Sequence, residues 1–413
     1  MARTSVPGPK LADFDAARAI VGRVAQATPM ESSRILSSIL GSEVLLKCEN
    51  LQRTGSYKVR GAYNLIATLT PAQRKKGVVA ASAGNHAQGV ALAAHELGIK
   101  ATIFMPVGVA LPKLEATRGY GANVVLEGNI FNESLTAAKA FAAKTGAIFI
   151  PPFDDPHVIA GQGTVGLEIL EEVPDVDTII VPIGGGGLIS GVAAAVKLRA
   201  AELGRKVRII GVQAENAAAY PPSLKAGKPV KVAVNPTISD GIAVATPGKL
   251  NFPIIKHFVD EVVTVSDDGT AKALVMLLER AKLVVEPAGA VSVAAILEGK
   301  VKKSGKTVAI LSGGNIDPML MQRIVAHGLA ASDRYLKLRI MLPDRPGQLA
   351  ATSQLVAEAN ANVVEVVHTR HGKFQINEAE LELHIETRGP THSKAVVKKL
   401  RDSGYQVRQI DDI

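Results

Sequence analysis

The chain has 413 residues, of which 47% are hydrophobic and 21% charged, so it can bury a large core in two or three domains and is not of the disordered class. Its formal net charge of +9 comes with only short basic runs, such as residues 74–76, and we expect solvated surface charge without a nucleic-acid-binding face. The single cysteine, Cys48, excludes an internal disulfide, and the absence of an apolar leader or spanning stretch predicts a soluble cytoplasmic protein without a membrane partner.

Short apolar runs alternate with Ala-rich helical patterns over most of the chain. The expected strands are residues 43–48, 77–81, 101–105, 123–126, 178–183, 207–212 and 307–311. The expected helices are residues 87–97, 111–118, 132–144 and 188–203. This alternation predicts an α/β architecture with a largely parallel sheet.

The pattern changes near residue 331, where we place a domain boundary that separates residues 1–331 from 332–413. Beyond it the expected order is strand 335–342, a turn and helix to about 359, strands 362–369 and 378–386, helix 393–403 and strand 405–410. The order βαββαβ is the ferredoxin-like arrangement.

A lysine among small and turn-forming residues is the first candidate for chemistry. Residues 47–62 read KCENLQRTGSYKVRGA, with Lys58 just after Thr54-Gly55-Ser56-Tyr57. A lysine that forms a Schiff base must be neutral when it attacks, which requires a desolvated pocket. The alternative is one more exposed helix lysine.

Three further loops follow expected strands. Free amides at a helix N-terminus bind anions, and four glycines in a row allow successive amides to converge on a phosphate. The glycine spacing does not fit the dinucleotide fingerprint. Helix capping or a flexible turn is the alternative for each loop. The loops are Ser82-Ala83-Gly84-Asn85-His86, Gly184-Gly185-Gly186-Gly187-Leu188 and Ser312-Gly313-Gly314-Asn315.

The four motifs, in this order, resemble those of fold-type II pyridoxal-phosphate (PLP) enzymes, specifically threonine dehydratases and serine racemases. The resemblance implies a two-lobed, tryptophan synthase β-like fold with a smaller lobe over roughly residues 48–154. It also implies that Lys58 carries PLP covalently and that Tyr57, where the family usually has Phe, packs near the cofactor.

The same resemblance assigns roles to the three loops. Residues 82–86 would clamp the substrate carboxylate, and Asn85 would bond the 3′-oxygen of PLP. The stretch Gly184–Leu188 would cradle the phosphate, and Ser312 would bond the pyridine nitrogen. Glu286 matches an acid that lines the cofactor pocket, although an acid at a helix start is the alternative.

Ala83 favours elimination over racemisation. A racemase needs an acid or base on each face of Cα, and serine racemases use a serine of this loop on the face opposite Lys58. Alanine cannot transfer a proton, and threonine dehydratases commonly carry it there. We therefore expect a threonine ammonia-lyase that makes 2-oxobutanoate and ammonia, and pyruvate from serine. Serine racemase, serine dehydratase and a non-catalytic amino-acid sensor are the alternatives.

No metal is expected. Some relatives hold a divalent cation near a Glu, a backbone carbonyl and an Asp. Glu215 and Ala219 match the first two, but Pro221 stands where the Asp belongs.

The C-terminal residues resemble an ACT domain, an amino-acid-binding regulatory module. The motif is a tight turn before a helix whose free amides would face an effector carboxylate, and the alternative is an assembly domain without a ligand. We expect a homodimer or homotetramer. The candidate effector residues are Asp344, Arg345, Pro346, Gly347, Gln348 and Leu349.

Overall fold

The computed structural model describes residues 6–330, 332–370 and 375–410. By its internal contacts the chain divides into two compact units, Met1–Asp317 and Pro318–Ile413, called here the N-terminal and C-terminal units. This division falls one helix before the expected boundary at residue 331, and the assignment of functional domains stays a prediction. Of the helices described, none has the length and apolar character needed to cross a membrane.

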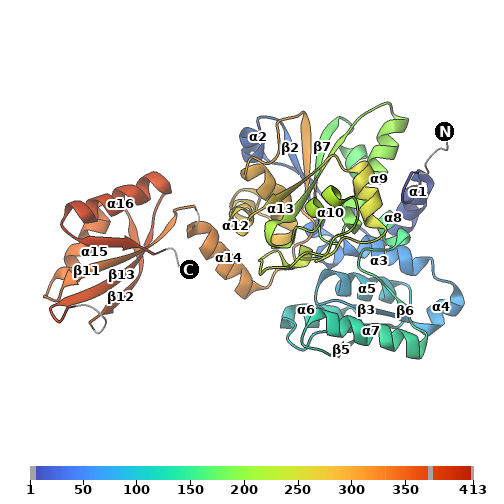
Figure 1. The fold of residues 1–413 in the computed structure, drawn as a ribbon, viewed down its shortest axis with the longest axis horizontal. Coiled ribbons are helices and arrows are strands. Elements are labelled where there is room, and N and C mark those ends of the chain that lie inside the picture. The colour runs from blue at the N-terminus through green and yellow to red at the C-terminus, as the bar shows by residue number, and fades with distance from the viewer. Residues whose placement is uncertain (1–5, 331, 371–374, 411–413) are drawn as a thin grey trace. The chain divides into compact units, whose positions relative to one another are not determined.

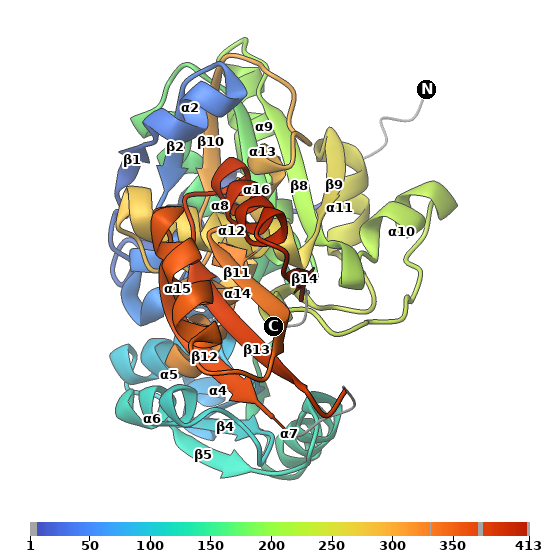
Figure 2. The same ribbon diagram turned by 90° about the vertical axis from the view of Figure 1, so that its left-hand side faces the viewer.

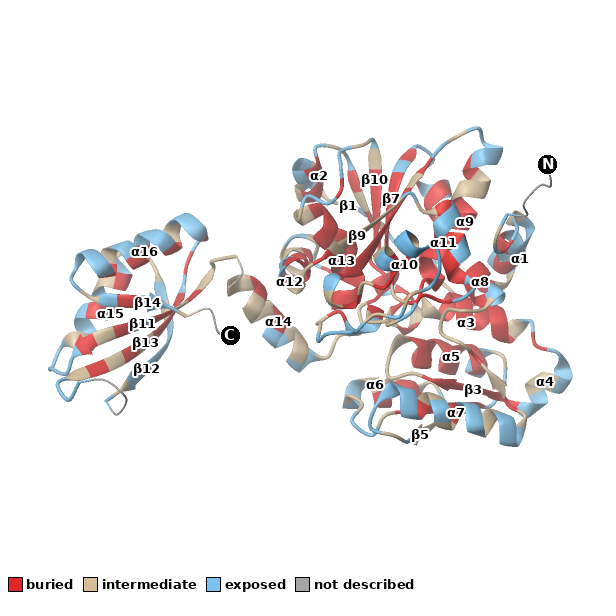
Figure 3. Cartoon of the chain, viewed as in Figure 1, coloured by how far each residue is buried: buried red, intermediate tan, exposed pale blue. Residues whose placement is uncertain are grey.

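The N-terminal unit is built on a six-stranded sheet whose central strands are buried (Figures 1 and 3). All neighbouring pairs are parallel except the edge pair β1–β2. The strands, in order across the sheet, are β1 (Met30–Ser32), β2 (Val44–Lys47), β10 (Lys306–Ile310), β7 (Val176–Pro182), β8 (Arg208–Ala214) and β9 (Glu261–Val265).

Helices cover this sheet, and its apolar residues contribute to a large buried core. They are α1 (Leu11–Val21), α2 (Arg34–Leu40), α8 (Pro156–Glu172), α9 (Gly187–Glu202), α10 (Tyr220–Ala226), α11 (Asn251–Phe258), α12 (Asp267–Met276) and α13 (Pro287–Leu297). Single helical turns lie between them: η1 (Glu49–Leu51), η2 (Arg53–Gly55), η3 (Glu215–Ala217), η4 (Asp240–Ile242) and η5 (Leu277–Ala281). This sheet and these elements are called the large lobe.

A second sheet, parallel throughout, forms the small lobe with five helices (Figure 1). Its strands, in order, are β5 (Asn123–Leu126), β4 (Ala101–Met105), β3 (Val78–Ala81) and β6 (Ile148–Phe149). The helices are α3 (Lys58–Ala67), α4 (Pro71–Lys76), α5 (Asn85–Glu96), α6 (Leu111–Gly119) and α7 (Phe131–Thr145). Its main core is separate from that of the large lobe.

Each of the four sequence motifs follows the carboxyl end of a strand. The lysine motif follows β2, residues 82–86 follow β3, the tetraglycine follows β7 and Ser312 follows β10. In open parallel sheets, ligands bind at the carboxyl ends of the strands. The topology therefore delivers all four motifs to the edges where a ligand is expected.

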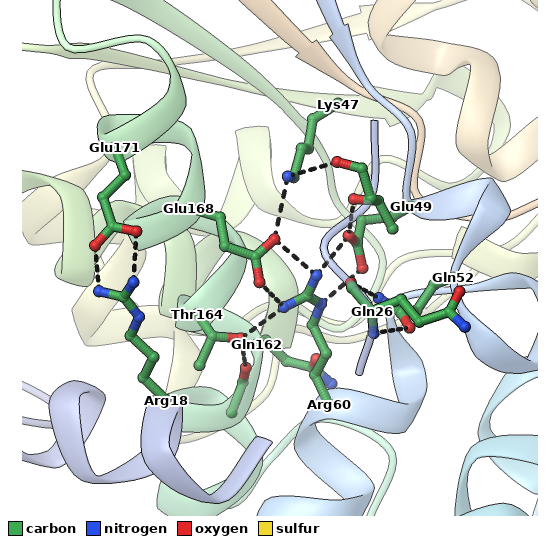
Figure 4. Close-up of polar contacts among 12 residues, drawn as sticks. Arg18, Gln26, Lys47, Glu49, Gln52, Arg60, Gln162, Thr164, Glu168 and Glu171 are labelled. Atoms are coloured by element: carbon green, nitrogen blue, oxygen red, sulfur yellow. Dashed lines mark hydrogen bonds and ion pairs between the residues drawn. The ribbon is translucent and has the colours of Figure 1, made fainter. Parts of the chain in front are cut away.

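A buried ionic cluster joins the lobes beneath the start of α3 (Figure 4). Arg60, on α3, directs all five of its N–H donors to Glu49, Glu168 and Thr164 at 2.5–3.1 Å. Lys47 donates to Glu172 at 2.6 Å and lies 3.1 Å from Glu168. The side chains of Lys47, Glu49 and Arg60 have no exposed surface, so this cluster ties β2, η1, α3 and α8 into one frame.

The C-terminal unit is a four-stranded antiparallel sheet preceded by α14 (Pro318–Ala330). The strand order is β12 (Asn362–Thr369), β13 (Glu378–Glu386), β11 (Tyr335–Pro343) and β14 (Gln406–Gln409). Helices α15 (Gln348–Glu358) and α16 (Pro390–Asp402) pack against each other (Figure 2). The expected α/β class with a ferredoxin-like second fold is confirmed.

Candidate active site

The lysine motif forms a strained turn that pairs with the Ser312 loop. Thr54 and Gly55 have φ angles of 65° and 67°, in the left-handed region that is costly for a β-branched residue. The amide of Tyr57 donates to the carbonyl of Ser312 at 3.2 Å, and the amide of Gly314 donates to the carbonyl of Gly55 at 2.8 Å. The two loops thus fix each other where α3 begins.

The amine of Lys58 has few polar neighbours. Its Nζ donates to the Pro152 carbonyl at 2.9 Å and lies 5.3 Å from the centroid of the Tyr57 ring. Burial lowers the pKa of Lys58 to about 8, partly opposed by the charge of Glu286. A large fraction of the amine is therefore neutral near pH 8, which is the state that a nucleophile or general base requires.

The loop after β3 leads directly into α5. Gly84 stands at the N-cap position, and Asn85 and His86 form the first turn. The His86 Nε2 lies 2.9 Å from the Ile150 carbonyl. Burial and the charge of Lys58 lower the pKa of His86 to about 3, so the ring is neutral and Nε2–H donates. The loop consequently offers amides and neutral polar groups, but no cation of its own.

Glu286 is turned away from the helix that it precedes. It stands at the N-cap position of α13, yet its side chain caps no amide of that helix. Instead it accepts a hydrogen bond from Asn85 Nδ2 at 2.6 Å. Burial raises the pKa of Glu286 to about 7 against the opposing Asn85 hydrogen bond. The Glu286 carboxyl group is therefore partly protonated near pH 7.

Asn315 fixes the amide orientation of Asn85. Its Nδ2 donates to Asn85 Oδ1 at 2.8 Å and to the Thr54 carbonyl at 2.7 Å. Because Asn85 Oδ1 is held by Asn315, Asn85 Nδ2 must face Glu286. One N–H of Asn85 then remains for a ligand.

The tetraglycine has no room for side chains. A Cβ on Gly185 would lie 2.4 Å from the Phe153 ring, and one on Gly186 would lie 2.1 Å from Tyr220 Oη. Gly186 also has a φ of 107° and precedes the first residue of α9. The first amides of any helix lack intrahelical partners, so this turn can surround an anion closely with backbone N–H groups.

Replacing Gly186 with alanine is expected to weaken PLP binding at least about tenfold, because the methyl group meets Tyr220 and the backbone loses a conformation that alanine rarely adopts. Titration of the apoenzyme with PLP would measure the change. Gly204→Ala is the matched control, since Gly204 has a φ of 66° and open space around it. Equal affinities for both variants would contradict a phosphate site at this turn.

The remaining expected residues lie as follows. Ser312 is buried, and its Oγ makes one long hydrogen bond, 3.5 Å, to the Ala288 carbonyl. Glu215 lies in η3, whereas Ala219 and Pro221 lie at the start of α10. Among the described residues, no group of three or more His, Cys, Asp or Glu side chains could hold a metal ion.

Residues 150–154, between β6 and α8, were not predicted from the sequence to take part in the site, although they contact three of the motifs. Ile150 bonds His86, Pro152 bonds Lys58, and Phe153 fills the space above Gly185 and Gly187. Asp154 accepts from the amides of residues 249 and 250 at 3.0 and 2.9 Å. The run Pro-Pro-Phe-Asp-Asp, rigid and unusual between a strand and a helix, was the available signal.

Comparisons with known proteins cover both units. The family model of pyridoxal-phosphate-dependent enzymes matches residues 22–313. An L-threonine ammonia-lyase of Thermotoga maritima is 50% identical over 400 residues, which are 96% of this chain and 98% of that protein. One of Geobacter sulfurreducens is 50% identical over 382 residues, 92% and 94% of the two chains.

Solved structures also match most of the chain. The processed form of threonine deaminase isoform 2 from Solanum lycopersicum has a TM-score of 0.72 and 38% identity, over 79% of this chain and 96% of that one. Maize serine racemase has a TM-score of 0.72 and 37% identity, over 77% and 97%.

Proposed function

The chain belongs to the pyridoxal-phosphate-dependent enzymes and, among them, to the threonine ammonia-lyases, and from this membership we propose that it converts L-threonine to 2-oxobutanoate and ammonia. L-Serine would give pyruvate and ammonia. The observation that carries the proposal is the Lys58 amine, which donates to the Pro152 carbonyl at 2.9 Å, has a pKa lowered by burial to about 8, and lies close enough to His86 for its charge to lower the pKa of that ring.

The residues present fit PLP. The tetraglycine would hold the phosphate, because its turn leaves amides free and excludes side chains. The free N–H of Asn85 would bond the 3′-oxygen, Tyr57 would pack near the cofactor, and Ser312 would bond the ring nitrogen. Glu286, bonded to Asn85, would line the pocket. Leu188 follows the cradle in the first turn of α9.

When bound, PLP supplies an electron-withdrawing ring that eases loss of the Cα proton and of the β-hydroxyl. Lys58 Nζ, neutral in part near pH 8, takes the Cα proton. The hydroxyl of Ser82 and the backbone amides of Ala83, Asn85 and His86 would orient the substrate carboxylate, since the first amides of α5 lack intrahelical partners. Ser312 brings a neutral hydroxyl rather than a carboxylate to the ring nitrogen, which favours prompt loss of the hydroxyl over storage of charge at Cα.

Incubation of the holoenzyme with L-threonine tests the proposal. Equal amounts of 2-oxobutanoate and ammonia are expected. Conversion of L-serine to D-serine, with no 2-oxobutanoate from threonine, would instead establish a racemase.

Ala83→Ser is expected to increase racemisation of serine, because it places a hydroxyl proton donor in the loop opposite Lys58. D-Serine formation, measured beside pyruvate formation by chiral chromatography, should be far slower than elimination in the wild type and should rise about tenfold or more in the variant. A wild type that racemises serine as fast as it eliminates would contradict the choice of reaction. Ala83→Gly, which adds no donor, is the control.

We also propose that the C-terminal unit is an ACT-type regulatory domain. The turn at residues 344–347 leads into α15, and Gly347 has a φ of 89° with open space around it. An amino-acid carboxylate would face the first amides of α15 near Gln348 and Leu349. Asp344 pairs with Arg370 at 3.2 Å, and Arg345 adds a positive charge to the turn beside Pro346. We further propose a cytoplasmic homodimer or homotetramer.

Gly347→Asp is expected to abolish effector binding while basal turnover persists, because the new anion would oppose the effector carboxylate. Calorimetry of the intact enzyme with isoleucine or valine would measure the loss. Gly347→Asn carries the same backbone strain without the charge and should retain most of the affinity. If the wild-type enzyme binds no amino acid at this unit, the unit serves assembly.

A further inference from the structure

We propose that Lys113 positions the substrate by holding its carboxylate beside Gly84, and that Asp240 competes for the same ammonium group. The inference rests on the proposed function, since it takes an amino acid as the ligand of residues 82–86. It adds a cation to a loop whose own side chains are neutral.

The first observation is where Lys113 stands. It lies in the first turn of α6, where the helix dipole disfavours a positive charge. A Cβ on Gly84 would lie 3.9 Å from Lys113 Nζ and 4.0 Å from its Cδ. The lysine stem therefore runs along Gly84, and its ammonium group ends at the loop.

The second observation is the weak pair that Lys113 makes. Its Nζ lies 3.8 Å from Asp240 Oδ2, with side chains 24% and 68% exposed. This separation is too long for a hydrogen bond, so the ammonium keeps its donors available for a closer anion. Asp240 begins η4 in the large lobe, whereas α6 belongs to the small lobe. The pair consequently spans the two lobes.

The third observation is the surrounding charge. Lys113 and Asp240 both act on the carboxyl group of Glu286, Lys113 lowering its pKa and Asp240 raising it. A substrate carboxylate that enters near the carboxyl groups of Asp240 and Glu286 would be repelled by them. His86 is neutral, and Lys58 acts in its uncharged form, so neither offsets that repulsion. Lys113 supplies the compensating charge, and a carboxylate that displaces Asp240 gains a charge-assisted hydrogen bond.

The experiment compares two amino-acid ligands of the holoenzyme. L-Alanine has no β-leaving group, and L-alaninamide replaces its carboxylate with a neutral amide; binding of each is followed through the visible absorbance of the cofactor. Lys113→Gln should weaken L-alanine binding about tenfold or more, because it removes a charged hydrogen bond to the carboxylate. The affinity for L-alaninamide should stay within about twofold of the wild-type value. For L-threonine, KM should rise while kcat stays within about twofold.

Asp240→Asn is expected to change the affinity for L-alanine in the opposite direction. Without its competitor, Lys113 should bind L-alanine more tightly, by about two- to fivefold for an exposed pair. Lys113→Arg should keep the discrimination between the two ligands. Lys197→Gln is the matched control, because Lys197 pairs with Asp260 at 2.7 Å on the large lobe, outside the site.

Equal weakening of both ligands by Lys113→Gln, or no weakening, would overturn the proposal, and so would weaker L-alanine binding in Asp240→Asn. If Lys113→Gln fails to bind the cofactor, Asp240→Asn and Lys113→Arg decide by the same comparison. An enzyme that discriminates between the ligands as expected, yet makes no 2-oxobutanoate from threonine, would refute the proposed function and leave the role of Lys113 standing.

Discussion

Replacing Lys58 with alanine is expected to lower 2-oxobutanoate formation by about 10⁴-fold or more, because one change removes both the covalent attachment of the cofactor and the general base. The loss follows from the place of the amine, which donates to Pro152 and has a pKa lowered to about 8. Stopped assays with threonine, together with the visible absorbance of lysine-bound PLP, would measure it.

Lys58→Arg should be equally inactive, since a guanidinium group cannot lose its proton at the working pH. Lys75→Ala, at an exposed position of α4, should behave as the wild type. The tetraglycine does not depend on Lys58, so the alanine variant should still take up PLP without a covalent bond. Substantial turnover by Lys58→Ala would refute the catalytic assignment, and full activity without PLP would refute the reaction class.

Replacing Arg60 with methionine is expected to cost about 3–5 kcal/mol of unfolding free energy, because it leaves the carboxylate of Glu49 buried without its partner. Arg60 binds Glu49 through two hydrogen bonds of 2.8 Å, and neither side chain has exposed surface. Denaturant unfolding followed by circular dichroism would show the loss as a lower midpoint. The unfolding free energy of Arg60→Lys should lie between those of the wild type and Arg60→Met, because lysine offers three donors in place of five.

Arg18→Met is the matched control. Arg18, on α1, forms a two-bond pair with Glu171 of α8 (Figure 4), but the side chains are 47% and 51% exposed. An exposed pair contributes about 0–1 kcal/mol, so this variant should unfold close to the wild type. Similar losses for both arginine variants would show that the buried cluster adds nothing beyond a surface pair.

The cost of Arg60→Met should also shrink in acid. Burial alone would raise the pKa of Glu168, but the charges of Arg60 and Lys47 outweigh it and hold this pKa below its usual 4.5. A carboxylate with a depressed folded-state pKa stabilises the fold above the unfolded-state pKa, and the contribution is lost as the pH falls through the folded-state value. Repeating the unfolding at neutral pH and below pH 4.5 tests this sign.

The sequence by itself determined most strands and the order of the motifs. Strands β4, β5, β12 and β13 have the expected bounds. The first three are short runs rich in β-branched and apolar residues, and β13 alternates polar with apolar residues. Such local signals do not depend on distant contacts. The motifs after β2, β3, β7 and β10 were equally visible, since each combines its small residues within a single loop.

Helix α8, in contrast, was not predicted from the sequence. Gly161, Gly163 and Gly166 weaken a helix by roughly 1 kcal/mol each relative to alanine. In the structure they allow close approach of neighbouring backbone: a Cβ on Gly163 would lie 2.8 Å from the Gly191 carbonyl, and one on Gly161 would lie 2.7 Å from the Arg60 carbonyl. Tertiary packing therefore offsets the local cost, which no reading of the segment alone can include.

The contacts that shape the site were likewise decided by the tertiary structure. Glu286 could have capped α13 by its position in the sequence, but 201 residues separate it from Asn85, to which it is bonded. Pro152 meets Lys58 across 94 residues, and Lys113 meets Asp240 across the two lobes. Sequence motifs fix which groups stand at each strand end, whereas the distances, burial and charges that set a pKa or orient an amide arise only when separate strand ends are brought together.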